Sequence, residues 1–244
     1  MEIKIHNIGS YIVKNYLLET PIGWIAIDTG YKGGENTFLK RFSRLAPVNE
    51  LKYLFLSHAH DDHAGFLAAL LERTDATVVL NPLSIPLLAA GENAIPPGAG
   101  FATQLASLFD LVKKDHSFPP VNREMLSGRS ILVPDESAQV FRDMGLPIRI
   151  VFLPGHTSDS MGLLLEETGQ LFCGDAAMNA VISTARHTIW IDDPAAYGRS
   201  WDKMLALGPG MLYPSHGSPF PPGDLVKYRH FMDGKKPIVP KRAT

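Results

Sequence analysis

The sequence contains very little cysteine, with only Cys173 among its 244 residues. A single cysteine cannot form a disulfide within the chain, and it excludes zinc or iron–sulfur sites that need several cysteines from one chain. Proteins that are stabilised without disulfides are typical of reducing compartments. We therefore expect a cytoplasmic protein.

The sequence also lacks long apolar runs and a strong net charge. No apolar run is long enough to span a bilayer, and residues 1–19 alternate polar and apolar side chains instead of forming an export signal. The 23 Lys and Arg residues nearly balance the 25 Asp and Glu residues, giving a formal net charge of -2. No overall field would attract nucleic acid or an anionic membrane. We expect a small-molecule substrate, no nucleic acid and no membrane, and a homodimer is one assembly that the sequence allows.

The hydrophobic share of 45% and the charged share of 20% are typical of a soluble protein with a sizeable core. We expect a single domain over residues 1–244. Strand patterns at 2–5, 11–18, 23–28, 51–57, 76–80, 147–153, 161–167, 171–175 and 210–217 alternate with helical patterns at 35–45, 62–73, 81–92 and 194–207. Such an alternation predicts an α/β (α+β) fold of two packed sheets flanked by helices.

The middle of the chain has a less regular pattern. Residues 98–115 read as a further helix, which a Pro- and Gly-rich stretch at 93–100 separates from the helix at 81–92. We expect a helical insert over approximately residues 92–130, which would either cap a site or pack on the surface.

Residues 54–65, LFLSHAHDDHAG, crowd three histidines and two aspartates between a predicted strand and a predicted helix. On an extended loop, side chains two residues apart point to the same side, so His58 and His60 could meet one cation. Asp62 and His63 could turn toward a second point. Imidazoles suit Zn, Fe, Ni or Mn, and carboxylates often bridge two ions. The alternative is a solvated loop in which Asp61 or Asp62 caps a helix that begins near Asp62 or His63, but this explains no histidine.

Three more potential ligands occur at predicted strand ends further along the chain. They are His156 in LPGHTSDS, Asp175 in LFCGDAA and His216 in YPSHGSP. The other four of the nine histidines lack this setting, and we expect them to be structural or surface residues: His6, His116, His187 and His230.

Taken together, these motifs resemble those of the metallo-β-lactamase superfamily. SHAHDDHAG resembles its HxHxDH signature, and IAIDTG, which carries Asp28, resembles its first motif. The stretches around His156, Asp175 and His216 resemble its third, fourth and fifth motifs, in the expected order. The resemblance spans roughly residues 3–220 and implies a four-layer αβ/βα sandwich of two mixed sheets flanked by helices.

The resemblance also implies a dinuclear metal centre. It assigns the first metal to His58, His60 and His156, and the second to Asp62, His63 and His216, with Asp175 bridging both. Asp28 would support the metal-bearing loop without binding metal. Two divalent ions are implied, zinc in the first place, with iron or manganese as alternatives. Asp62 would also orient or deprotonate the attacking water.

The residues in and around these motifs most resemble those of the glyoxalase II and lactonase-like branch. This resemblance implies a hydrolase that cleaves a thioester, ester or lactone. Two features depart from that branch. Only residues 217–244 follow His216, where glyoxalase II proper has a helical glutathione-binding domain. Met178 stands where acyl-homoserine lactonases have a tyrosine.

Other functions remain open at this level. One is a non-haem iron oxidoreductase similar to persulfide dioxygenase, and another is a phosphodiesterase of the same fold. A third is a binding module on a degenerate site, which the filled ligand positions disfavour. Two residues near Asp175 raise separate questions: Arg186 is predicted to contact an anionic substrate group, and Cys173 either approaches the site or is a small buried strand residue.

Overall fold

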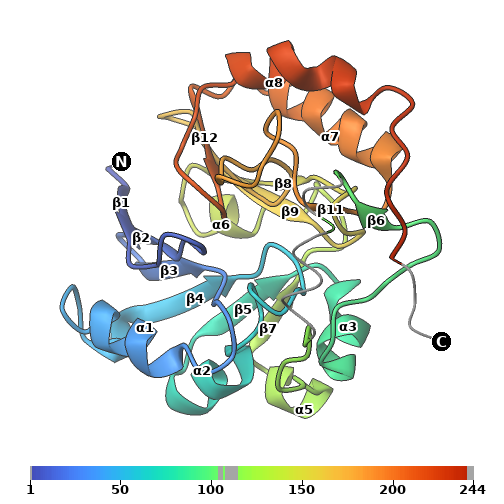
Figure 1. Cartoon of the computed structure of the whole chain (residues 1–244). Coiled ribbons are helices and arrows are strands. Elements are labelled where there is room, and N and C mark those ends of the chain that lie inside the picture. The colour runs from blue at the N-terminus through green and yellow to red at the C-terminus, as the bar shows by residue number, and fades with distance from the viewer. Residues whose placement is uncertain (1, 104–106, 108–114, 241–244) are drawn as a thin grey trace. The chain divides into compact units, whose positions relative to one another are not determined.

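The computed structural model describes residues 2–103, 107 and 115–240 (Figure 1). The contacts within the chain divide it into two compact units. Unit 1 comprises residues 1–93 and 116–148, and unit 2 comprises residues 94–115 and 149–244. The prediction of a single domain, with a capping insert over 92–130, stays a prediction.

Unit 1 contains a six-stranded mixed sheet with the strand order β1-β2-β3-β4-β5-β7. Its strands are β1 (Lys4–Asn7), β2 (Tyr16–Thr20), β3 (Gly23–Ile27), β4 (Leu51–Phe55), β5 (Thr77–Leu80) and β7 (Ser130–Leu132). The first three strands pair antiparallel, and β3, β4, β5 and β7 pair parallel. Parallel neighbours end at the same edge of a sheet, so the segments that follow β3 and β4 begin side by side.

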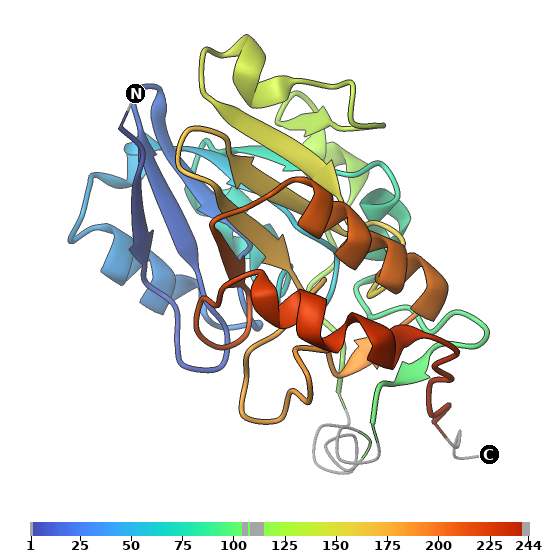
Figure 2. The same ribbon diagram turned by 90° about the horizontal axis from the view of Figure 1, so that it is seen from above.

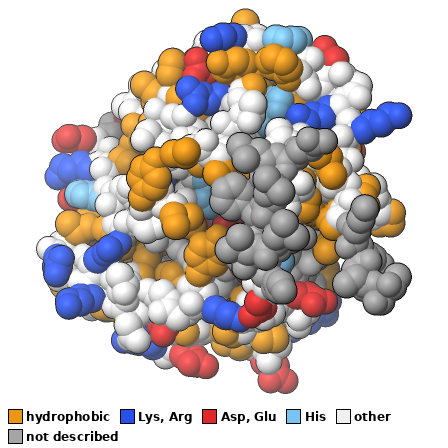
Figure 3. All heavy atoms as spheres, viewed as in Figure 1, with side chains coloured by type: hydrophobic (Ala, Val, Ile, Leu, Met, Phe, Trp, Pro, Cys, Tyr) orange, Lys and Arg blue, Asp and Glu red, His pale blue; other side chains and the backbone are white. Residues whose placement is uncertain are grey.

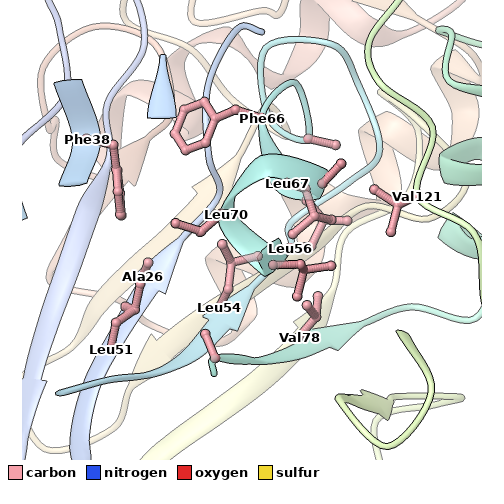
Figure 4. Packing of buried hydrophobic residues seen from close by; sticks show 14 of the residues in the cluster. Ala26, Phe38, Leu51, Leu54, Leu56, Phe66, Leu67, Leu70, Val78 and Val121 are labelled. Carbon is pink, nitrogen blue, oxygen red and sulfur yellow. The ribbon is translucent and has the colours of Figure 1, made fainter. Parts of the chain in front are cut away.

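The helices of unit 1 pack on this sheet through a hydrophobic cluster. Ala26, Leu54 and Val78 form a row across β3, β4 and β5, and Leu67 and Leu70 of α2 lie over that row (Figure 4). The helical elements of the unit are α1 (Glu35–Phe42), η1 (Val48–Glu50), α2 (Leu67–Arg73), α3 (Ser84–Ala90), α5 (Arg123–Leu126) and α6 (Val140–Asp143). Removing such side chains from water is the main stabilising contribution of the unit, roughly 1.5–3 kcal/mol for each large one.

Unit 2 contains a four-stranded mixed sheet with the order β12-β10-β9-β8 and a two-stranded ribbon, β11-β6. The strands are β6 (Gly100–Phe101), β8 (Ile148–Phe152), β9 (Met161–Leu165), β10 (Gln170–Gly174), β11 (Trp190–Ile191) and β12 (Met211–Pro214). β10 pairs antiparallel with β9 and parallel with β12. The carboxyl ends of β10 and β12 therefore lie side by side.

One long helix, α7 (Pro194–Ala206), covers this second sheet, followed by α8 (Gly223–Tyr228) and η2 (Arg229–Met232) (Figure 2). Asp193 caps α7 by accepting hydrogen bonds from the amides of Ala195 and Ala196, at 2.9 and 3.0 Å. Tyr197 and Trp201 of α7 are fully buried in the core of the unit. The helix that the sequence predicts over 194–207 is thus confirmed.

Two mixed sheets flanked by helices confirm the predicted fold class. Two local predictions are wrong. The helix after β4 begins at Leu67 rather than at Asp62 or His63, and residues 100–101, predicted as helix, form strand β6. The rest of the helix predicted over 98–115 lies mostly outside the described residues. Among the described residues, no helix is both long and apolar enough to cross a membrane.

Candidate metal-binding site

The predicted ligands of unit 1 lie where β3 and β4 end side by side. Asp28 directly follows β3, and its amide continues the sheet by donating to the carbonyl of Phe55 at 2.9 Å. Asp28 has a backbone φ of 59°, in the left-handed region that Asp and Asn enter more readily than most residues. This turn leaves its carboxylate buried beside the loop that follows β4.

Asp28 anchors that loop through three hydrogen bonds. Its carboxylate accepts from the amide and the hydroxyl of Ser57, both at 2.7 Å, and from Nδ1 of His63 at 2.8 Å. The Ser57 hydroxyl lies 3.0 Å from Nδ1 of His58, and because it donates to Asp28 it can accept from His58. An ionised carboxylate only accepts, so Nδ1 carries the proton in His58 and His63. Their Nε2 atoms are then the nitrogens with a lone pair for a metal.

The four predicted ligands of this loop gather around one point. The His58 ring lies 4.8 Å from the ring of His60 and 3.9 Å from that of His63, centroid to centroid. An oxygen of Asp62 lies 3.6 Å from Nε2 of His63, and the hydroxyl of Tyr31 donates to the other Asp62 oxygen at 3.4 Å. The histidines are buried and Asp62 is partly exposed. Unit 1 thus presents three imidazoles and one accessible carboxylate together.

Turns occupy residues 61–66, which explains why the helix prediction was wrong there. Both the amide and the hydroxyl of Thr29 donate to the carbonyl of His63 at 2.7 Å, so this carbonyl binds the segment after β3. Gly65 fits a place with no room for a side chain, since an added Cβ would lie 2.2 Å from the carbonyl oxygen of Asp61. The side chain of Asp61 accepts from Nδ2 of Asn93, and the backbone amide of Asp61 donates to Oδ1 of Asn93, so Asp61 does not cap a helix.

Unit 2 brings three predicted ligands from distant parts of the sequence together. Asp175 follows β10, His216 follows the parallel strand β12, and His156 lies on the loop between β8 and β9. One oxygen of Asp175, Oδ2, lies 3.7 Å from Nε2 of His156 and 3.4 Å from Nε2 of His216. All three residues are buried.

The tautomer of His156 is fixed in the same way as in unit 1. Its Nδ1 lies 2.8 Å from the carbonyl oxygen of Trp190, which can only accept, so Nδ1 carries the proton and Nε2 the lone pair. The hydroxyl of Thr188 lies 3.3 Å from the same nitrogen. One carboxylate oxygen between two Nε2 atoms is a donor set that suits Zn, Fe or Mn. The residues present in each unit therefore fit divalent metal.

Sequence reasoning missed the residues that orient these histidines. Ser57 could have been found, because it precedes the first histidine of the motif and carries a hydroxyl. The carbonyl of Trp190 could not, because any residue provides a carbonyl and only the β11 ribbon brings this one to His156. Support of this kind depends on the fold rather than on residue type.

Cys173 and Arg186 have defined surroundings within unit 2. Cys173 lies in the hydrophobic core that α7 covers, and burial, followed by the charge of Asp175, raises the pKa of its thiol to about 12. Arg186 donates to Asp224 and Asn179. The prediction that Arg186 contacts an anionic substrate group stays a prediction.

Comparison with known proteins agrees with these motifs. A model of the metallo-β-lactamase superfamily matches residues 9–216. The lactamase-like protein nscB of Trichophyton verrucosum is 27% identical over 237 residues, which cover 92% of this chain and 66% of that protein. A second nscB, from Arthroderma benhamiae, is 30% identical over 78% of this chain and 33% of its own length. The chain thus spans between about a third and two thirds of the length of these curated relatives.

Solved structures share the fold. TTHA1623, crystallised in a di-iron-bound form, matches with a TM-score of 0.61 and 24% identity over 92% of this chain and 98% of that one. A peroxy diiron species of the chemotaxis sensor ODP matches with a TM-score of 0.59 and 16% identity over 97% of this chain and 93% of that one. The family match over most of the chain, on motifs that place histidines and aspartates at strand ends, shows that the chain belongs to the metallo-β-lactamase superfamily.

Proposed function

We propose that the protein is a metal-dependent hydrolase in which the His/Asp clusters of the two units together hold two divalent cations, zinc in the first place. One cation would be bound by His58, His60 and His156, the other by Asp62, His63 and His216. Asp175 would bridge them. The observation that carries the proposal is the fixed tautomer of His58, His63 and His156, each of which has Nδ1 held and Nε2 ready for metal.

Bound divalent cations would supply a water of lowered pKa and polarise a carbonyl or phosphoryl oxygen. We propose that Asp62 would handle the proton of that water. It is the one partly exposed carboxylate of its cluster, and the Tyr31 hydroxyl holds one of its oxygens at 3.4 Å. Asp62 would accept or orient the proton as a general base, a role worth about 10²–10⁴-fold in rate.

The substrate class we propose is a thioester, ester or lactone, as in the glyoxalase II and lactonase-like branch. An electrophilic carbonyl attacked by an activated water needs no redox partner, and the family is mostly hydrolytic. Phosphodiester cleavage of nucleic acid is less well supported. On the face drawn in Figure 3, the Lys and Arg side chains of the described residues are scattered and form no large patch.

A second candidate is an iron-dependent oxidoreductase similar to persulfide dioxygenase. It is favoured by one observation, that two structurally similar proteins carry di-iron centres. Histidine and carboxylate donors suit iron as well as zinc. The nature of the metal that the purified protein retains therefore separates the two candidates.

We further propose a small-molecule substrate and action in the cytoplasm, which a single buried thiol supports. A homodimer is the assembly to test, by light scattering of the purified protein.

The proposed function is tested by metal analysis together with a hydrolysis panel of thioester, lactone, phosphodiester and β-lactam substrates. We expect two metal ions per chain and turnover of a thioester, ester or lactone. Asp62→Asn should lower kcat by about 100-fold or more, because the amide cannot accept the proton. Asp75→Asn, an exposed acid of the same unit, is the control and should leave kcat unchanged.

Less than one bound metal per chain, with no turnover after reconstitution, would contradict the dinuclear hydrolase. Iron together with oxygen uptake on a persulfide substrate would establish the second candidate instead.

A further inference from the structure

Each nitrogen of the Arg186 guanidinium group contacts a polar side chain of unit 2. Its Nε and Nη2 atoms both donate to Oδ2 of Asp224 at 2.7 Å, and Nη1 donates to Oδ1 of Asn179. The flat face of the group lies over the buried ring of Phe220, with Cζ 5.1 Å from the ring centroid. Asp224 lies in the first turn of α8, so the ion pair joins the segment after β10 to the segment after β12.

Asn179 transmits this contact to the loop that carries His216. Its amide N–H donates to the carbonyl of His216 at 2.9 Å, and its side-chain Nδ2 donates to the carbonyl of Ser218 at 2.8 Å. Asn179 therefore holds the chain on both sides of Gly217. The fit is close, since a Cβ on Gly217 would lie 2.0 Å from the carbonyl oxygen of Asn179.

The orientation of the Asn179 amide depends on Arg186. A guanidinium group only donates, so it selects the oxygen of the amide. The nitrogen of the amide must then face the carbonyl of Ser218, which only accepts. Without Arg186 the side-chain amide is free to turn over, which would break its bond to the Ser218 carbonyl and leave the backbone bond to the His216 carbonyl as the remaining link to the loop.

The backbone around Arg186 shows that this arrangement is maintained against strain. Ala185 and Arg186 have φ values of 54° and 64°, a left-handed conformation that costs roughly 1–2 kcal/mol for a residue with a side chain. The carbonyl of Arg186 accepts from the amide of Met178 at 2.9 Å, and this bond joins the two ends of the loop formed by residues 178–186. Strained residues of this kind persist where surrounding contacts over-determine them.

We infer that Arg186 is a positioning residue for His216, acting through Asn179 and held in place by Asp224. The inference rests on the proposed function only in naming His216 as a metal ligand. Partners that orient a ligand commonly change metal affinity by about 10- to 100-fold. Each of the three guanidinium nitrogens contacts Asp224 or Asn179, which favours a structural role over recognition of a substrate anion.

The test compares Asp224→Asn, Arg186→Gln and Asn179→Ala with the wild-type protein and with Asp202→Asn as a matched control. Asp202 forms an ion pair with Arg229 elsewhere in unit 2, at 2.7 Å. Metal-free protein is titrated with Zn²⁺ against a competing chelator. We expect one of the two ions to bind about 10- to 100-fold more weakly in the three variants, and both to bind as in the wild type in the control.

A second measurement needs no metal. Hydrogen exchange of residues 215–219 in the metal-free protein should be faster in Asp224→Asn than in the wild type, and unchanged in Asp202→Asn. If the wild-type protein failed to bind two ions, the proposed function would fail, but this exchange measurement would still decide the role of Arg186.

Wild-type exchange and wild-type metal affinity in Asp224→Asn would overturn the inference. A raised KM for anionic substrates in Arg186→Gln alone, with metal binding intact, would show that Arg186 contacts substrate instead. Should Arg186→Gln fail to fold, Asp224→Asn carries the test, because it alters the ion pair without removing the guanidinium group.

Discussion

At the scale of the residue, the histidines depend on neighbours that bind no metal themselves. Asp28 is the clearest case, since one buried carboxylate holds Ser57 and His63 directly and His58 through the serine hydroxyl. The turn requires a left-handed backbone at this position, and aspartate adopts that conformation more readily than most residues. The chemistry of the loop therefore depends on a residue outside the HxHxDH motif.

Asp28→Asn keeps the size and the backbone preference of the residue but replaces one acceptor oxygen with a donor. We expect metal affinity to fall by about 10- to 100-fold. The free energy of unfolding of the metal-free protein should fall by about 1–3 kcal/mol, because a buried donor is left facing another donor. Chelator competition and urea unfolding measure the two effects. Equal values in Asp28→Asn and Asp75→Asn would show that the carboxylate does not orient the histidines.

Cys173 yields a prediction of the opposite kind, an absence of reactivity. Burial raises the pKa of its thiol to about 12, so the reactive thiolate is scarce at neutral pH. We expect iodoacetamide to modify Cys173 only after unfolding in denaturant, as followed by mass spectrometry. Rapid labelling of the native protein at about pH 7 would mean that the thiol is accessible, as a site residue would be.

At the scale of the element, the important structure is the turn between β4 and α2. The HxHxDH stretch gathers its side chains because residues 61–66 fold as turns, with the carbonyl of His63 bound by Thr29. A helix starting at Asp62 would have used that carbonyl internally. The delayed start of α2 thus contributes directly to the geometry of the site.

Gly65→Ala tests the importance of this turn. The new methyl group would meet the carbonyl oxygens of Asp61 and Gly30, at 2.2 and 2.4 Å, and the backbone cannot move away without shifting the loop. We expect the free energy of unfolding to fall by about 2 kcal/mol or more, with weaker metal binding. The matched control is Gly223→Ala, where an added Cβ meets nothing within 4 Å and the change should stay within about 0.5 kcal/mol. Similar stability of the two variants would contradict the close packing at Gly65.

At the scale of the whole molecule, the buried titratable groups of unit 2 make stability depend on pH. Burial, assisted by the ammonium group of Lys235, lowers the pKa of His187 to about 4. Between about pH 6.5 and 4 the folded state therefore binds fewer protons than the unfolded state, and stability falls as the pH falls. Burial raises the pKa of Asp192 to about 7, which has the opposite sign and offsets the His187 contribution as the pH falls from about 7 to 4.

His187→Phe removes one of these two effects. The ring lies among aromatic neighbours, 5.2 Å from Trp201 and 6.4 Å from Phe231 between centroids, which suits phenylalanine. We compare the free energy of unfolding of the two metal-free proteins as the pH is lowered from about 7 to 4. Over this range we expect the value for the variant to rise relative to that of the wild type by up to roughly 3 kcal/mol. Urea unfolding at a series of pH values measures the difference. Parallel pH profiles for the two proteins would show that His187 does not titrate as a buried group.

Much of the fold and of the metal chemistry could be predicted from the sequence because both depend on patterns among neighbouring residues. Strand and helix periodicity predicted most of the elements, and the seven histidines and aspartates of the motifs stand out by residue type and by their place at strand ends. These features need only neighbouring residues for their recognition.

The tertiary structure decided what depends on contacts between distant residues. It placed α2 after a turn, directed Asp61 to Asn93, buried Cys173 under α7 and bonded Arg186 to Asp224. It also supplied the carbonyl of Trp190 to His156. The sequence determined which side chains can bind metal, because this follows from their chemistry. Which nitrogen each of three histidines can offer, and which residues hold the rings, was decided only when folding brought separate segments together.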